Sequence, residues 1–178
     1  MADLILALSR ISDDLWRESA TNHGSVTWLP LWLVSSSGLR IGLDRNGRWV
    51  VGRLPGRASV SQENLSPGWL PILDHDESVA REEVAHAGGR YNLPVDLLLE
   101  SLPVDDVIAL ALSTHNAHWI DRALIWLESR DIRDDIGALL PLVASSRSAS
   151  QRARQRARRL IKGRSEPIEA GESNSESS

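Results

Sequence analysis

The chain has 178 residues, and its 20 Lys and Arg against 24 Asp and Glu give a formal net charge of −4. The absence of cysteine excludes disulfides, thiolate metal sites and cysteine nucleophiles. The apolar start from Leu4 to Leu8 is too short for a signal peptide or a membrane-spanning helix, so we expect a cytoplasmic protein that does not bind membranes.

Residues 2–21 predict a helix, because four apolar side chains recur at helical spacing: Leu4, Leu8, Ile11 and Leu15. Residues 26–54 predict a small antiparallel meander. Apolar and polar residues alternate from Leu39 to Leu43, and the following Asp-Arg-Asn-Gly has the composition of a hairpin turn. Pro30 in the first strand of the meander indicates an edge position or a bulge.

The predicted meander is rich in tryptophan, with Trp28, Trp32 and Trp49. These side chains are candidates for the lining of a groove that binds a ligand or a partner. A chain with seven Trp and no Phe also needs Trp as its large core residue, and we favour the core interpretation.

Residues 55–76 contain several Pro and Gly and predict an irregular segment. Four apolar residues within it indicate that the segment lies on the core: Trp69, Leu70, Ile72 and Leu73. The chain is therefore expected to divide into an N-terminal helix and meander over 1–76, a helical block over 77–164, and a tail over 165–178. The tail is poor in apolar residues and predicts disorder.

Within the helical block, the first helix is expected to end at Gly88 and Gly89. Shorter helices are expected to follow, over 94–101, 103–113, 117–129 and 133–145. The expected fold class is α+β.

Amphipathic runs in the second half of the chain carry a resemblance to a known architecture. They are Trp119 to Glu128, then Leu139-Leu140-Pro141-Leu142, then the Arg-Ala repeats that follow Gln151. With them, residues 94–162 resemble a HEAT-type array of antiparallel helix pairs. The resemblance implies a scaffold or interaction surface, and it transfers no functional residue.

The last expected helix, over 148–162, is strongly basic. From Arg147 to Arg164 the chain holds seven Arg and one Lys without an acid, whereas residues 1–146 hold 12 Arg and 20 acids. At about 100° per residue, Ala149, Ala153 and Ala157 share one face. The other side carries the candidate binding residues: Arg152, Arg154, Arg156, Arg158, Arg159 and Lys162.

This basic side can be a solvated outer face that ends a helical stack, or it can neutralise the phosphates of nucleic acid. The solvated face is the favoured interpretation, because the rest of the chain is acidic and repels a long polyanion. With its segregated charge and no catalytic constellation, the chain is expected by elimination to be a non-catalytic protein–protein interaction module, such as a bacterial adaptor or immunity-type binder. Nucleic-acid binding through 147–164 is the alternative, and an enzyme of unrecognised type is the third candidate. The partner protein and the oligomeric state are not indicated.

Two further clusters have metal-ligand residue types, His115 with His118 and Asp121, and the acids from Asp74 to Glu77. Asn116 is expected to be the N-cap of the helix over 117–129, which leaves His115 outside that helix. Helix capping and dipole roles are the favoured interpretation of both clusters. No nucleophile, phosphate-loop or metalloprotease motif occurs, so we expect no catalytic residue, no metal and no cofactor.

Overall fold

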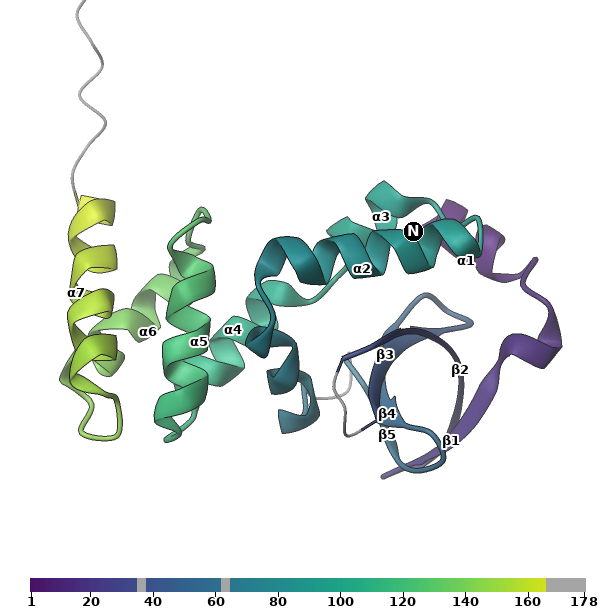
Figure 1. Ribbon diagram of the computed structural model, residues 1–178, viewed down its shortest axis with the longest axis horizontal. Coiled ribbons are helices and arrows are strands. Elements are labelled where there is room, and N and C mark those ends of the chain that lie inside the picture. Colours follow the sequence, from purple (N-terminus) through teal and green to yellow (C-terminus); the bar gives the residue numbers. More distant parts are fainter. Residues whose placement is uncertain (35–37, 62–64, 166–178) are drawn as a thin grey trace, which may run out of the picture.

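The computed structural model describes residues 1–34, 38–61 and 65–165. The chain has an α+β fold, in which a curled antiparallel sheet at one end is followed by helices that extend to the other end (Figure 1). The described strands lie in the sheet in chain order: β1 (Arg17–Thr21), β2 (Gly24–Leu33), β3 (Leu39–Asp44), β4 (Trp49–Arg53) and β5 (Ala58–Val60). The sheet curls until its first and last strands approach, where Ala20 pairs with Arg57.

The prediction of one helix over 2–21 is wrong. The helix α1 (Ala2–Leu8) is short, a 3₁₀ turn η1 (Asp13–Leu15) follows, and residues 17–21 form β1. Along β1 the side chain of Ser19 is buried between exposed neighbours, and the whole strand pairs with β2. Backbone pairing with a strand later in the chain therefore overrides the local helical spacing.

The bulge expected at Pro30 is confirmed, because the β2–β3 register shifts between Pro30 and Trp32. The edge strand β1 pairs only with residues 24–28 of β2, so Pro30 lies where β2 has a single neighbour and one backbone N–H is dispensable. Opposite the bulge stands Gly42. A Cβ at this position would lie 1.9 Å from the Leu29 carbonyl oxygen, so the close approach of β2 and β3 requires glycine.

The segment 55–76 lies on the core as expected. It contains β5 and the 3₁₀ helix η2 (Pro67–Asp74), whose apolar side chains Trp69, Leu70, Ile72 and Leu73 are buried. The next helix, α2 (Glu77–Arg90), runs through the two glycines that were expected to end it. Gly88 is buried, and a Cβ there would lie 2.6 Å from Leu98 Cδ2, so this glycine lets two helices pack closely. The chain turns instead at Asn92, with φ 53°.

The remaining helices follow the expected order: α3 (Val95–Glu100), α4 (Val104–Ser113), α5 (Ala117–Leu127), α6 (Asp134–Ser145) and α7 (Gln151–Ser165). The pairs α4–α5 and α6–α7 stack, because α4 packs on α6 and α5 packs on α7. The helix α7 is the outermost element of the stack (Figure 1).

One contiguous apolar core runs from Leu4 in α1 to Ala157 in α7 and so joins the sheet to the helices. The expected tail lies outside the described residues except for Ser165, which ends α7. None of the helices in the described part of the chain has the length and apolar character needed to cross a membrane.

Candidate functional site

The inner face of α7 is formed by alanines and is fully used for packing. Ala149, Ala153 and Ala157 are buried, and the last two are 0% exposed. These small side chains let α7 lie close to α6, its main neighbour, and to α5. The basic helix is therefore docked on the stack, and only its outer surface is available to a partner.

Arg156 does not lie on that outer surface. Its side chain is 9% exposed, and its Nε lies 2.6 Å from Glu128 Oε1 at the end of α5. Arg156 comes three residues after Ala153 and so lies at the edge of the buried face. The expectation that Arg156 contributes to a solvated or phosphate-binding surface is corrected by this ion pair.

Two further arginines are engaged by main-chain carbonyls. Arg154 Nη1 donates to Ala149 O at 2.6 Å, and Arg158 Nη2 donates to Ala144 O at 3.3 Å. Ala144 lies in the last turn of α6, where helix carbonyls lack intrahelical donors and favour cations, and Ala149 lies in the segment that leads into α7. Arg154 is half-buried and Arg158 is exposed. Both arginines stabilise the α6–α7 connection.

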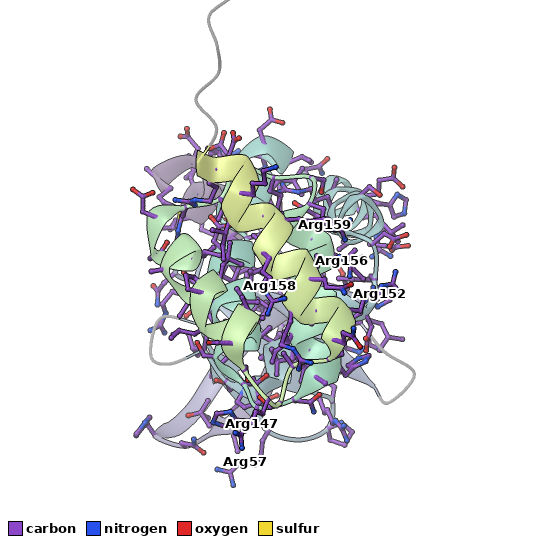
Figure 2. All side chains as sticks on the ribbon, turned by 90° about the vertical axis from the view of Figure 1, so that its left-hand side faces the viewer. Arg57, Arg147, Arg152, Arg156, Arg158 and Arg159 are labelled. Carbon is purple, nitrogen blue, oxygen red and sulfur yellow. The ribbon has the colours of Figure 1, made fainter. Side chains whose placement is uncertain are left out.

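The arginines that remain available form what we call the end face: Arg147, Arg152 and Arg159. All three are exposed, and Figure 2 looks onto the surface that carries them. Arg147 and Arg152 form no hydrogen bond or ion pair within the described part of the chain. Arg159 is 73% exposed and approaches Glu128 Oε1 only to 4.0 Å. Lys162 is also exposed.

The three tryptophans proposed for a groove do not share one. Trp28 belongs to a small separate cluster and donates from Nε1 to Ser19 Oγ at 3.0 Å. The ring of Trp32 meets the His75 ring edge-on at 4.9 Å. Trp49 donates to Ser101 Oγ at 3.1 Å. All three side chains are buried, which agrees with the core interpretation.

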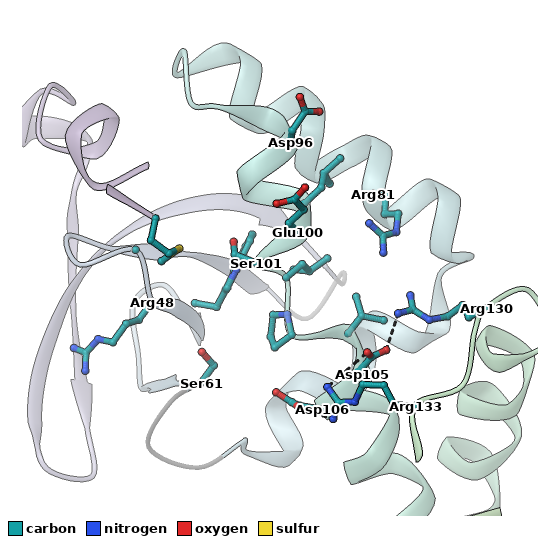
Figure 3. A pocket seen from close by; sticks show the side chains of 17 residues that line it. Arg48, Ser61, Arg81, Asp96, Glu100, Ser101, Asp105, Asp106, Arg130 and Arg133 are labelled. Atoms are coloured by element: carbon teal, nitrogen blue, oxygen red, sulfur yellow. Dashed lines mark hydrogen bonds and ion pairs between the residues drawn. The ribbon is translucent and has the colours of Figure 1, made fainter. Parts of the chain in front are cut away.

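A central cleft of about 1000 Å³ was missed from the sequence. It lies where the β3–β4 turn, the α3–α4 segment and the loop before α6 meet, and charged side chains from these elements surround it (Figure 3). Its residues are up to 132 positions apart, from Met1 to Arg133. Local sequence patterns do not show that residues so far apart in the chain come together in the fold.

Ion pairs hold one wall of the central cleft. Arg130 binds Glu77 of α2 through Nη1 and Asp105 of α4 through Nη2, the latter at 2.6 Å. Arg133 lies 2.6 Å from Asp135 and 3.6 Å from Asp105. The hydrogen bond from Arg133 is the main reason that the pKa of the Asp135 carboxyl falls below its usual value, and it raises the pKa of Arg133.

Two hydroxyls, those of Ser61 and Ser101, lie in the described lining of the central cleft. No histidine lines it, and the hydroxyl of Ser101 is occupied, since it donates to Leu98 O at 2.9 Å and accepts from Trp49. Each lining arginine has a carboxylate partner. The hydroxyl of Ser101 is therefore not activated by a base, and the lining arginines are neutralised by carboxylates.

The two sequence clusters with metal-ligand residue types are dispersed. His118 Nε2 lies 2.7 Å from Asp74 Oδ1, whereas Asp121 accepts from Ser150. Asn116 caps α5 as expected, by accepting from the His118 N–H at 2.9 Å. Among residues 1–34, 38–61 and 65–165, no three His, Asp or Glu side chains come together in a way that suits a metal ion.

Comparisons of the chain with models of protein families, with curated proteins and with solved structures find no match. The HEAT-type resemblance of residues 94–162 therefore stays a prediction.

Proposed function

We propose that this protein is a non-catalytic interaction module that binds an acidic surface of a partner protein through the end face. The observation that carries the proposal is the difference between the buried and the exposed side chains of α7. Its alanines pack inward, whereas Arg152 and Arg159 are exposed on this outermost helix and Arg147 is exposed in the segment just before it. Exposed guanidinium groups pair bidentately with carboxylates, and arginine is enriched at protein interfaces.

The contacts of the other arginines argue against nucleic acid as the main partner. Arg154, Arg156 and Arg158 are engaged within the molecule, so the end face offers far fewer cations than the sequence suggests. Tight binding to a duplex usually neutralises about 6–10 phosphates. Residues 1–146 carry 20 acids against 12 Arg and would repel the rest of a long polyanion.

The proposal is tested by fluorescence anisotropy of the full chain with labelled poly-glutamate, single-stranded RNA and duplex DNA at about 50 mM salt. We expect poly-glutamate to bind, because it presents the carboxylates of an acidic protein surface. The variant Arg152→Gln/Arg159→Gln should weaken this binding about tenfold, since two exposed ion pairs of up to about 1 kcal/mol each are lost.

The matched control is Arg10→Gln/Arg90→Gln, which removes the same charge from exposed positions far along the chain from α7. This control should bind poly-glutamate like the unchanged protein. Tighter binding of RNA or DNA than of poly-glutamate, lost in the Arg152/Arg159 variant, would favour the nucleic-acid alternative. Failure of all three probes to bind would leave the end face as a solvated cap.

A further inference from the structure

A second concave region lies at the β4–β5 hairpin, away from the central cleft. It consists of two adjoining hollows of about 390 and 250 Å³. The hollows share four lining residues: Asn22, Ala58, Ser59 and Ser66. We call them together the hairpin cleft. Their combined size is in the range of sites for small molecules.

The hairpin cleft differs from the central cleft in its charge. Arg53 and Arg57 line it, and none of the described lining residues is Asp or Glu. Arg57 Nη2 donates to Asn22 Oδ1 at 2.7 Å, which fixes its guanidinium group beside the β1–β2 turn without neutralising it. The Arg53 side chain has no hydrogen bond or ion pair within the described residues. Both positive charges are therefore available to a ligand.

Neutral donors in the same lining also suit an anion. Ser66 is the N-cap of η2, and Gly68 follows in the first turn, where backbone N–H groups lack intrahelical acceptors. The hydroxyls of Ser59 and Ser66 are additional donors in the lining. Such donors at a helix N-terminus favour negative charge and add to the two guanidinium groups.

Small residues keep the hairpin cleft open. A Cβ at Gly52 would lie 2.7 Å from the Cβ of Ala58, and one at Gly68 would lie 3.2 Å from Ser66 Oγ. Larger side chains at these positions would fill the space or move its walls. Apolar walls from Leu39, Val51 and Pro55 leave room for an uncharged ligand body beside the arginines.

We propose that the hairpin cleft binds a small phosphate monoester. A phosphate dianion matches two guanidinium groups together with hydroxyl and backbone donors better than a single carboxylate does. The inference is independent of the proposed function, because β4 and β5 lie in the sheet and α7 lies at the far end of the helices (Figure 1).

The test is a titration of the ¹⁵N-labelled full chain with inorganic phosphate and with glycerol 3-phosphate, followed by NMR at constant ionic strength. We expect saturable shifts of the N–H signals of Ser59, Ser66 and Gly68, and a much weaker response to acetate. Arg53→Gln should weaken binding about tenfold, through loss of a charge-assisted hydrogen bond. Arg53 is the preferred position because its side chain has no structural partner to lose.

Arg10→Gln is the matched control, since it removes one exposed positive charge outside the hairpin cleft and should leave the phosphate affinity unchanged. Vesicles with and without phosphatidic acid identify the source of the phosphate. Binding that depends on phosphatidic acid and is displaced by glycerol 3-phosphate would assign a lipid headgroup, and absence of vesicle binding would assign a soluble ester. The proposal is overturned if no shift saturates, if acetate acts equally, or if Arg53→Gln binds normally.

Discussion

Ala153→Glu is expected to lower the free energy of unfolding by about 2–4 kcal/mol. The Ala153 side chain is 0% exposed, on the face of α7 that packs on α6 and α5. A glutamate at this position must either bury a carboxylate or push α7 away from its neighbours. Either outcome removes apolar contact from the end of the core that α7 covers.

Urea unfolding followed by tryptophan fluorescence measures this effect, because Trp126 in α5 is buried in the same apolar core as Ala153. Gln155→Glu is the matched control. It introduces the same side chain into the same helix at an exposed position, and its cost should stay within about 0.5 kcal/mol. Equal costs for the two variants would show that α7 is not docked through its alanine face.

Features with a local physical cause could be predicted from the sequence. Asn116 was expected to cap α5, and its side chain accepts the bond that defines such a cap. The turn after β3 was expected from its composition, and Gly47 there has φ +75°. Pro30 marked the bulge in β2 because proline removes a backbone donor wherever it stands.

Features that depend on distant pairing could not be predicted in the same way. The helical spacing of apolar side chains ends at Leu15, and only the partners of residues 17–21 in β2 make these residues a strand. Gly88 looked like a helix stop, because the sequence does not show that Leu98 needs the space beside it. Tertiary contacts override local preference in both cases.

Only part of the candidate site could be predicted from the sequence, because the rest depends on contacts between distant elements. The alanine face of α7 follows from helical periodicity alone. The distribution of the arginines does not, because it depends on where other helices end. Arg156 meets Glu128 because α5 ends beside it, and Arg158 reaches Ala144 because α6 ends there. The hairpin cleft likewise depends on the curl of the sheet, which brings Asn22 to Arg57.

Arg130→Met is expected to lower the free energy of unfolding by about 2–3 kcal/mol. The side chains of Arg130, Glu77 and Asp105 are 17%, 16% and 26% exposed, so removing the cation leaves two largely buried carboxylates without their shared partner. Loss of one partner from a fully buried pair costs about 3–5 kcal/mol, and the partial access of water here reduces that cost. The buried Nε of Arg130 has no hydrogen-bond partner, which reduces the cost further.

Arg133→Met is the control for this prediction, because it removes one positive charge from the same wall of the central cleft. The Arg133 side chain is 46% exposed, and its ion pairs should be worth less than about 1 kcal/mol. Glu77 keeps Arg81 at 2.9 Å and Asp105 keeps Arg133 at 3.6 Å, but both have lost their shared cation. Adding Glu77→Gln and Asp105→Asn to Arg130→Met should recover much of the lost stability, since these two largely buried groups then carry no charge. If the triple variant is no more stable than Arg130→Met, the arginine acts through packing of its stem instead of through the ion pairs.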